Sequence, residues 1–392
     1  MSRAIVIIPT YNERGNIERT ISAVLDQAPK ILPWELQVLV VDDTSPDKTY
    51  ELVKSLSKKN SSIKLLVNKN KAGLGAAYLK GMAHAFGELG ADVIFEFDAD
   101  LSHDPTKIPD FLKEIDGGAD VVLGTRYKNG GSIPADWGLH RKFISVFGNI
   151  IIRAVLGSFK YSDWTSGYRC IKKKAYEAVV PYLVGDRFSG YTFQIGFLYY
   201  AQKQGFDIRE SVPYHFIDRE IGQSKIGPEY MKNTLEFIFK VRLQELMRSR
   251  IFKFAVVGGL GALVQLIALG IFRRLLSDDM FVLATFLSIE TAVVSNFIWN
   301  NLWTFKDKRL KSSQIPLKFL TFNASSAGSI LIQLVVAWLG ERLFGLAVLF
   351  TLPVIAISVD LGHVYAVAGI LIGMVWNFFA YSKFVWNSKP KK

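Results

Sequence analysis

The uneven distribution of charge along the chain limits its fold more than any other feature. Charged side chains are dense up to about Lys253, whereas the segment 254–305 contains only Arg273, Arg274, Asp278, Asp279 and Glu290. Four later segments are long and apolar enough to cross a bilayer as helices, namely 251–272, 280–305, 317–339 and 364–384. The sequence therefore predicts a water-exposed first part, followed by a multi-pass domain in the cell membrane.

The predicted spans form a tandem repeat of two helical hairpins. Val264-Gln265-Leu266 in the first hairpin recurs as Ile332-Gln333-Leu334 in the second, and Asn296-Phe297 recurs as Asn377-Phe378. We expect Glu290, which lies within a span, to have a structural partner there.

One further apolar run, 343–359, is an insertion in the second repeat and contains Pro353. A fifth span there would place the C-terminal lysines on the opposite side of the membrane from the basic residues at 306–311. The positive-inside rule therefore favours four spans, with this run interfacial or re-entrant.

Before residue 225, short apolar runs alternate with stretches of helical periodicity. The runs predict strands at 4–8, 36–41, 63–67, 92–97 and 121–124, and the periodic stretches predict helices at 16–27, 48–58 and 75–86. Such alternation is typical of βαβ units. We predict an α/β, Rossmann-like domain over 1–225, with a mostly parallel sheet and flanking helices, then a linker over 226–250 and an all-α transmembrane domain over 251–392.

The residue pattern of the linker and the net charge of the chain both bear on its association with the membrane. Apolar residues of 228–250 are interleaved with Lys240, Arg242, Arg248 and Arg250. This pattern is compatible with a basic helix in the membrane interface and with a helix that packs on the first domain. The net charge of +12 favours an anionic lipid surface and phosphate-bearing substrates over nucleic acid, because of the long apolar spans.

Two features bear on the compartment of the first domain. The single Cys170 excludes an intrachain disulfide and any cysteine-based zinc site. The apolar run before Pro9 is too short for a signal peptide. We therefore expect the first domain and both termini to be cytoplasmic.

Acidic side chains follow directly after two predicted strands. Asp98 and Asp100 close the strand at 92–97, and Asp42-Asp43 closes the strand at 36–41. In open α/β sheets, ligands bind beyond the carboxyl ends of the strands. Paired carboxylates suit Mg²⁺ or Mn²⁺ held against a substrate diphosphate. Transfer from a nucleotide-sugar needs such a cation, because the departing diphosphate takes on negative charge.

The blocks Ile7–Glu13, Val40–Asp47 and Asp98–His103 together resemble family 2 inverting glycosyltransferases of the GT-A fold. Further blocks are similar to the dolichol-phosphate mannose synthase family: 124–127, 140–145, Asp218-Arg219 and Gln223-Ser224-Lys225. This match covers nearly all of residues 3–225. The membrane part resembles the four-helix GtrA-like family through its paired-hairpin pattern.

The resemblance implies roles for individual residues. It implies a nucleotide-sugar site made of Pro9, Tyr11, Glu13, Val41, Asp43, Asp98, Ala99, Asp100, Arg126, Arg219 and Lys225. The metal would be held by Asp98 and Asp100, with Ser102 where some relatives carry a Gln. Arg126, Arg141 and Ser145 would bind the acceptor phosphate. The catalytic residues would be Asp100, Arg126, Arg141, Arg219 and Lys225.

The implied reaction moves mannose from GDP-mannose to dolichyl or another polyprenyl phosphate and gives the β-linked product. A phosphate monoester has a second pKa of about 6, so the acceptor is already anionic at neutral pH. It needs charge compensation more than an activating base. Two alternatives stay open, namely a UDP-glucose-dependent polyprenyl-phosphate glucosyltransferase and a glycolipid transporter or scaffold with a nucleotide-binding domain.

Overall fold

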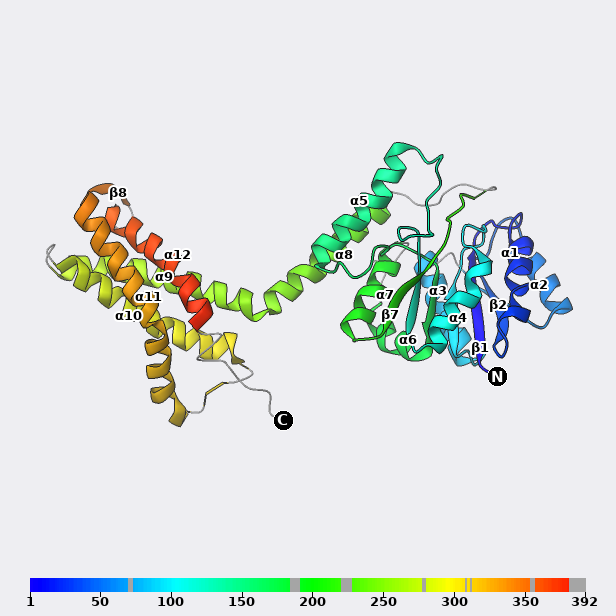
Figure 1. The fold of residues 1–392 in the computed structure, drawn as a ribbon, viewed down its shortest axis with the longest axis horizontal. Helices are drawn as coiled ribbons and strands as arrows, with labels where there is room; N and C mark the ends of the chain where they lie inside the picture. The colour runs from blue at the N-terminus through cyan, green and yellow to red at the C-terminus, as the bar shows by residue number, and fades with distance from the viewer. Residues whose placement is uncertain are drawn as a thin grey trace. The chain divides into compact units, whose positions relative to one another are not determined.

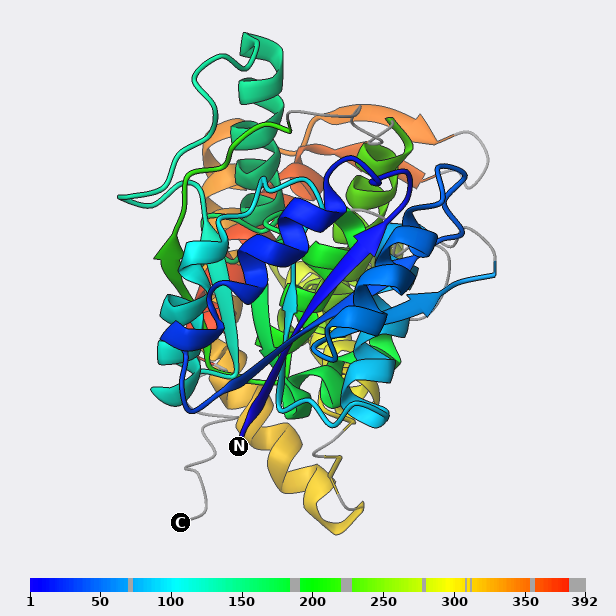
Figure 2. The same ribbon diagram turned by 90° about the vertical axis from the view of Figure 1, so that its right-hand side faces the viewer.

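The computed structural model describes residues 1–69, 73–183, 191–219, 228–276, 280–306, 309–310, 312–352 and 357–380. The chain divides into two compact units, Met1–Arg242 and Leu243–Lys392. A sheet flanked by helices forms the first unit, and the second is mainly helical (Figures 1 and 2).

The first unit is built on a seven-stranded sheet with the order β3-β2-β1-β4-β6-β5-β7. Its strands are β1 Arg3–Thr10, β2 Glu35–Asp42, β3 Ile63–Val67, β4 Val93–Glu96, β5 Val121–Thr125, β6 Arg169–Lys172 and β7 Ile208–Pro213. All neighbouring pairs are parallel except those of β6, which runs antiparallel to both β4 and β5. The predicted α/β class with a mostly parallel sheet is confirmed.

Helices cover both faces of this sheet, which is why its central strands read as continuous apolar runs. The helices are α1 Ile17–Leu25, α2 Thr49–Lys59, α3 Leu74–Gly87, α4 Ile108–Asp116, α5 Leu139–Leu156, α6 Lys173–Val179, α7 Tyr191–Lys203 and α8 Pro228–Arg248. Along β1, Ile5 and Ile7 join the core under α3, α5 and α7, whereas Val6 and Ile8 join the core under α1, α2 and α4.

Helix α8 presents apolar residues in two directions. Phe237, Ile238 and Val241 are buried in the core of the first unit. Leu235 and Phe239 lie on the same helix and are exposed. Packing on the first domain thus accounts for one side of this segment, and the exposed side carries apolar residues interleaved with charged ones such as Lys232 and Lys240.

The second unit contains α9 Arg250–Leu275, α10 Phe281–Trp299, α11 Ile315–Phe344 and α12 Leu361–Ala380. Among the described residues, three helical segments are long and apolar enough to cross a membrane, namely Arg250–Leu275, Phe281–Thr304 and Ser312–Phe344, and Leu361–Asn377 is a shorter apolar helix. Helix α9 packs on α10, and α11 packs on α12.

The described part of the apolar run at 343–359 forms no fifth helix. Within it, β8 Val348–Leu352 pairs antiparallel with β9 Ile357–Asp360. Glu290, on α10, has a partner, because its carboxylate accepts a hydrogen bond from the Asn323 amide at 2.8 Å. Pro353 and the C-terminal lysines lie outside the described residues.

Candidate active site

The loops that follow β1, β2 and β4 meet at one edge of the sheet. Thr10 pairs with Asp42 in the register of β1 and β2, and Ile7 pairs with Glu96 in that of β1 and β4. The non-glycine residues with positive φ in the described part of the chain all lie in these loops. They are Asn12, Thr44, Lys48 and Leu101. Strained backbone of this kind clusters at functional sites, where surrounding contacts hold it in place.

Asp42 and Asp43 have different surroundings at this edge. The carboxylate of Asp42 accepts hydrogen bonds from the Thr10 hydroxyl at 2.7 Å and from the Ser45 hydroxyl at 2.7 Å. Asp43 accepts one from the Asn68 amide at 2.6 Å and one from the backbone N–H of Gly73 at 3.1 Å. Asp42 therefore fixes the loop, and Asp43 lies beside the N-terminus of α3.

The other predicted nucleoside residues border the same loops. Pro9 and Val41 are paired near the ends of β1 and β2. Tyr11 and Glu13 follow β1, and the Glu13 carboxylate accepts a hydrogen bond from the Asn16 amide at 3.0 Å. Ala99 is buried between the two carboxylates described next.

Asp98 and Asp100 follow β4 and face a histidine and an arginine. The backbone N–H of Asp98 donates to Nδ1 of His103 at 3.1 Å, and Oδ2 of Asp100 lies 3.2 Å from Nη2 of Arg219. Burial, followed by the neighbouring Asp100 carboxylate, raises the pKa of Asp98 to about 7. A divalent cation placed here would favour the ionised form.

His103 is a structural support in this arrangement. Its ring stacks on Tyr168 with centroids 4.9 Å apart, and burial lowers the pKa of its imidazole to about 3. It is therefore neutral at physiological pH and holds the loop after β4 in place through Asp98.

The donor set at this loop fits a hard divalent cation. Such a cation is commonly bound by one or two carboxylates together with substrate phosphates and water. Asp98 and Asp100 supply the carboxylates. The hydroxyl oxygen of Ser102 is buried and has no hydrogen-bond partner among the described residues. No cluster of three or more His, Cys, Asp or Glu side chains suitable for a metal occurs in the described part of the chain, so substrate oxygens would have to complete the coordination.

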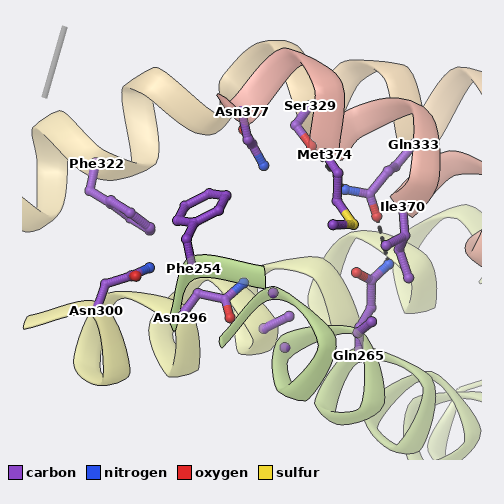
Figure 3. Close-up of a pocket in the computed structure, with 14 residues that line it drawn as sticks. Phe254, Gln265, Asn296, Asn300, Phe322, Ser329, Gln333, Ile370, Met374 and Asn377 are labelled. Carbon is purple, nitrogen blue, oxygen red and sulfur yellow. Dashed lines mark hydrogen bonds between the residues drawn. The ribbon is translucent and has the colours of Figure 1, made fainter. Parts of the chain in front are cut away.

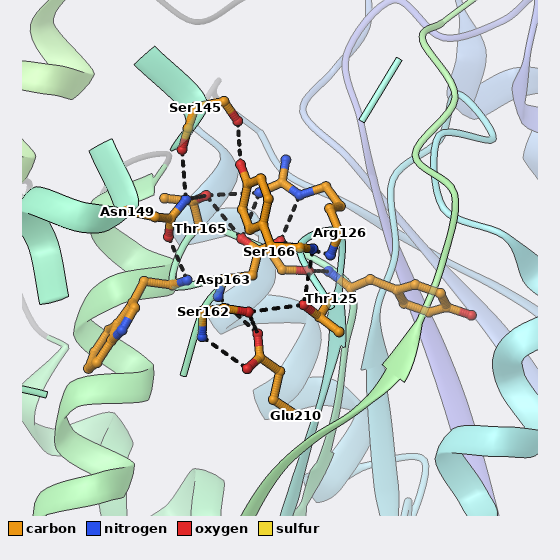
Figure 4. A network of polar contacts seen from close by, with 12 residues as sticks. Thr125, Arg126, Ser145, Asn149, Ser162, Asp163, Thr165, Ser166 and Glu210 are labelled. Carbon is orange, nitrogen blue, oxygen red and sulfur yellow. Dashed lines mark hydrogen bonds and ion pairs between the residues drawn. The ribbon is translucent and has the colours of Figure 1, made fainter. Parts of the chain in front are cut away.

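Arg126, just after β5, is held by a buried ion pair (Figure 4). Its Nε and Nη2 donate to the two oxygens of Asp163, each at 2.7 Å, and Nη2 also donates to Thr165 at 2.9 Å. Burial alone would lower the pKa of Arg126, but the Asp163 carboxylate outweighs it and raises the pKa. Arg126 is thus a fixed positive charge, with part of its charge compensated by Asp163.

A second layer of contacts holds this pair. Glu210 accepts hydrogen bonds from the Ser162 hydroxyl at 2.6 Å and from the backbone N–H of Asp163 at 2.9 Å. Asn149 accepts one from the backbone N–H of Trp164 at 2.7 Å and donates to Thr165 at 3.2 Å. These contacts fix the segment 162–165 under Arg126 (Figure 4).

Helix α5 carries two faces with different chemistry. Arg141, Ser145 and Asn149 follow each other at four-residue spacing and so share one face. Ser145 hydrogen-bonds the Tyr127 hydroxyl at 2.6 Å, beside Arg126. Leu139 and Phe143 belong to a run of exposed apolar residues on the same helix, which also includes Ile144, Val146, Phe147, Ile150 and Ile151.

A chain of hydrogen bonds and ion pairs joins α5 to the loop after β4, which carries Asp98 and Asp100. Arg141 donates to Asp218 at 2.7 Å, and its guanidinium lies over the ring of Trp137 at 3.9 Å. Asp218 also accepts the backbone N–H of Arg219, whose side chain contacts Asp100. The structure thus brings together Arg141, Arg219 and Asp100, and it brings together Arg126 and Ser145 through Tyr127. Lys225 lies outside the described residues.

Several side chains of this network were not predicted from the sequence. Asp163, Glu210 and Asn149 stand in no motif that pattern or spacing would single out, and Tyr127 lies in the block 124–127 but was given no role. Their common property is burial beside a charged partner, which depends on contacts between segments far apart in the chain. The one local sign of this network is the run of small and polar residues at 162–166, which surrounds the buried Trp164.

Two family profiles match the chain. Glycosyl transferase family 2 matches residues 5–180, and the GtrA/DPMS transmembrane domain matches residues 253–386. The dolichol-phosphate mannosyltransferase of Pyrococcus furiosus is 32% identical over 336 residues, which cover 85% of this chain and 89% of that protein. The polyprenol monophosphomannose synthase of Mycolicibacterium smegmatis is 37% identical over 240 residues, which cover 61% and 85%.

A third relative, the undecaprenyl-phosphate mannosyltransferase of Micrococcus luteus, is 36% identical over 225 residues, which cover 57% of this chain and 88% of that protein. The first similarity extends through both units, whereas the other two cover less of this chain. The chain therefore belongs to the dolichol-phosphate mannosyltransferase family, with a family 2 glycosyl transferase domain followed by a GtrA/DPMS transmembrane domain.

Proposed function

We propose that this protein transfers mannose from GDP-mannose to dolichyl or another polyprenyl phosphate, with inversion at the anomeric carbon. The chain of contacts from Asp100 through Arg219 and Asp218 to Arg141 carries this proposal. It links a carboxylate suited to a donor-side cation with an arginine on a helix that also bears an apolar surface. The names of the relatives support the same donor and acceptor classes.

The donor side of the proposal rests on the loops after β1, β2 and β4. Asp43, near the N-terminus of α3, would accept hydrogen bonds from the base, which suits the N–H donors of guanine. Asp98 and Asp100 would hold Mg²⁺ or Mn²⁺, and the cation would compensate charge on the departing diphosphate. Arg219, and Lys225 by family resemblance, would bind the same diphosphate.

The acceptor side rests on α5 and Arg126. Arg126, Arg141 and Ser145 would bind the phosphate of the lipid, and the exposed apolar residues of α5 would contact its chain or the surrounding membrane. Because the phosphate oxygen is anionic at neutral pH, the residues must position it and compensate its charge. No base is required, which agrees with the burial of His103 and with the lowered pKa that makes its imidazole a weak base. The oxygen attacks the anomeric carbon from the face opposite the diphosphate, and the α-linked donor gives a β-linked product.

We further propose that the first unit and both termini face the cytoplasm, where nucleotide-sugars are made. Helices α9, α10, α11 and α12 would then be four spans. With four spans, Lys253 at the start of the first span and Lys306 just after the second lie on the same side of the membrane as the first unit. The positive-inside rule assigns this side to the cytoplasm. Protease protection of tagged termini in sealed vesicles tests this orientation.

A direct assay tests the reaction. Purified full-length protein is incubated with labelled GDP-mannose, Mn²⁺ and polyprenyl phosphate, and label is measured in the organic extract. We expect extractable mannose, loss of the signal with a chelator, and recovery on addition of excess Mn²⁺ or Mg²⁺. Asp100→Asn should abolish turnover, whereas Asp136→Asn, an exposed carboxylate, should not. Transfer from UDP-glucose in place of GDP-mannose, or no extractable label at all, would refute the proposal.

A further inference from the structure

The second unit contains a polar cavity between its helices (Figure 3). Its volume is about 60 Å³, which gives room for a few water molecules. Its polar lining comes from all four helices and consists of Gln265, Asn296, Asn300, Ser329, Gln333 and Asn377. Such a group of carboxamides is unusual within helices that otherwise carry apolar side chains, and the reaction proposed above uses none of them.

The repeated sequence motifs meet in this cavity. Gln265 and Gln333 occupy equivalent places in the two hairpins, and their side chains are hydrogen-bonded to each other at 2.8 Å. Asn296 and Asn377 are also equivalent, and both line the cavity. Each hairpin therefore contributes the same pair of residue types to a common site (Figure 3).

Glycines make the close approach of these polar groups possible. A Cβ atom at Gly261 on α9 would collide with the amide of Asn296 on α10, and a Cβ at Gly373 on α12 would collide with the Ser329 hydroxyl on α11. Both hairpins thus use a glycine on one helix to admit a polar side chain from the other. The arrangement is a built feature of the bundle.

The cavity is short of hydrogen-bond donors. The side-chain oxygens of Asn296, Asn300 and Asn377 are buried and have no hydrogen-bond partner among the described residues. Asn300 as a whole is only 3% exposed to solvent. Leaving a buried polar group unpaired is unfavourable, and native structures pair nearly all such groups. The three oxygens therefore call for donors supplied by something bound in the cavity.

The chemistry of the lining narrows the class of ligand. None of the residues that line the cavity is charged, which disfavours a phosphate or another ion. The unpaired oxygens disfavour a lipid chain, which has no donors. Amides that both donate and accept suit an uncharged group that does the same, such as a hydroxyl.

We propose that the two hairpins enclose a hydrated site that takes up hydroxyl groups of a sugar and not its whole ring, because a volume of about 60 Å³ holds only a few water molecules. The hydroxyls could reach it on a glycolipid in the membrane or on a free sugar, and both offer the same donors. The membrane-borne source rests on the proposed function, whose product would be such a glycolipid. The site itself rests on the geometry of the second unit alone.

Cysteine labelling in the full-length protein tests both parts of the proposal. Ala262 lines the cavity, whereas its neighbour Leu263 lies at the same depth and is 55% exposed on the outside of the bundle. The native Cys170 is buried and burial raises its thiol pKa, so the unmodified protein serves as the blank. A small methanethiosulfonate reagent reacts with the thiolate, which forms where water is present. We expect Ala262→Cys to react at least tenfold faster than Leu263→Cys in nanodiscs.

Ligand protection then identifies the source of the hydroxyls. Synthetic mannosyl phosphoryl polyprenol, free mannose and unglycosylated polyprenyl phosphate are added separately to Ala262→Cys. Slowing of at least threefold by the mannosyl lipid or by mannose, without slowing by polyprenyl phosphate, supports the proposal. Equal rates for the two cysteines would show a dry cavity, and hydrated but unprotected Ala262→Cys would show a site for water only. Either result overturns it, as does equal protection by polyprenyl phosphate.

A second substitution links protection to the unpaired oxygens. Asn300→Leu in the Ala262→Cys protein should remove the protection and leave the gel-filtration profile unchanged, with Asn377→Leu as the replacement if the first variant fails to fold. Thr291→Val changes an exposed side chain on α10, the helix that ends just before Asn300, and should leave protection intact. Because the glycolipid is added and labelling is the readout, failure of the mannosyl transfer assay is distinguishable from failure of this site.

Discussion

At the residue scale, the proposed acceptor site depends on two carboxylates to which the sequence analysis assigned no role. Arg126 and Arg141 are each held by a specific acid, Asp163 and Asp218 respectively. The two pairs differ in burial, because Arg126 and Asp163 are almost fully buried whereas Arg141 and Asp218 are partly exposed to solvent. Removal of the acid should therefore affect mainly folding in the first pair and mainly binding in the second.

Asp163→Asn should destabilise the first unit strongly, because it leaves the Arg126 guanidinium buried without a compensating charge. Breaking a buried pair in this way costs about 3–5 kcal/mol. For a domain of this size, each kcal/mol corresponds to about 2–4 °C in melting temperature. We expect a decrease of at least about 6 °C in a thermal unfolding scan, with Asp136→Asn unchanged as the control. An unchanged melting temperature would show that Asp163 does not stabilise Arg126.

Asp218→Asn should weaken binding of the acceptor and leave the fold intact. The Arg141–Asp218 pair is partly exposed, so its contribution is about 0.2–1 kcal/mol and the acceptor KM should rise about 1.5- to 5-fold. The donor KM, measured in the same assay, should change less. If the donor KM rose more than the acceptor KM, Asp218 would act through Arg219 and Asp100 instead.

The same pair makes a prediction about pH. The hydrogen bond from Arg141 lowers the pKa of Asp218 below its ordinary value of 3.8. A carboxylate with a lowered pKa keeps its contribution above the ordinary value and loses it as the pH falls through the lowered one. The ratio of acceptor KM values between Asp218→Asn and the wild type should therefore be equal at pH 5.5 and pH 8, although each KM changes with ionisation of the lipid phosphate. A ratio that falls toward one at pH 5.5 would contradict this assignment.

At the element scale, helix α5 combines the proposed phosphate contacts and an apolar surface. Phe143 and Phe147 stack on each other with centroids 4.0 Å apart, and both are exposed. An exposed apolar patch next to a polar site marks a surface for lipid or protein. Arg141 and Ser145 on the same helix indicate lipid with an anionic head.

Replacing Phe143 and Phe147 by Ala should raise the KM for a long-chain polyprenyl phosphate about tenfold, since loss of buried apolar area costs about 25 cal/mol per Å². The KM for a short, water-soluble isoprenyl phosphate should stay the same, because it needs the phosphate contacts alone. Leu32→Ala removes another exposed apolar side chain, from a loop before β2, and serves as the control. Parallel increases for both acceptors would place the defect in phosphate binding.

Some strands of the sheet were predictable from the sequence and others were not. Strands β1, β2 and β4 and the carboxylates after them were predictable, because buried parallel strands read as apolar runs that end at the ligand edge. Strand β6 was not, since Arg169-Cys170-Ile171-Lys172 becomes a strand only through pairing with β4 and β5. The pairing of Asp163 with Arg126 and of Asp218 with Arg141 was not predicted for the same reason, because it comes from contacts across the fold. The repeat of Gln265 and Gln333 was visible, but the cavity between them was not.

At the scale of the whole molecule, the two units have separate hydrophobic cores. The first unit has one core on each face of its sheet, and the second has clusters around Phe297 and around Leu269. Units with their own cores can fold and open independently. Ligand binding to one of them need not stabilise the other.

GDP with Mn²⁺ should therefore protect the first unit alone. A ligand present at about 100 times its Kd stabilises the folded state by about 2.7 kcal/mol, which for a domain of this size corresponds to about 5–10 °C. Hydrogen exchange followed by mass spectrometry can resolve the two units in one sample. We expect slower exchange in peptides of β1, β2 and β4 and unchanged exchange in α9 to α12, with Asp100→Asn as the control that loses the effect. Equal protection of both units would mean that nucleotide binding is coupled to the membrane helices, and the cavity between the hairpins would then report on the state of the active site.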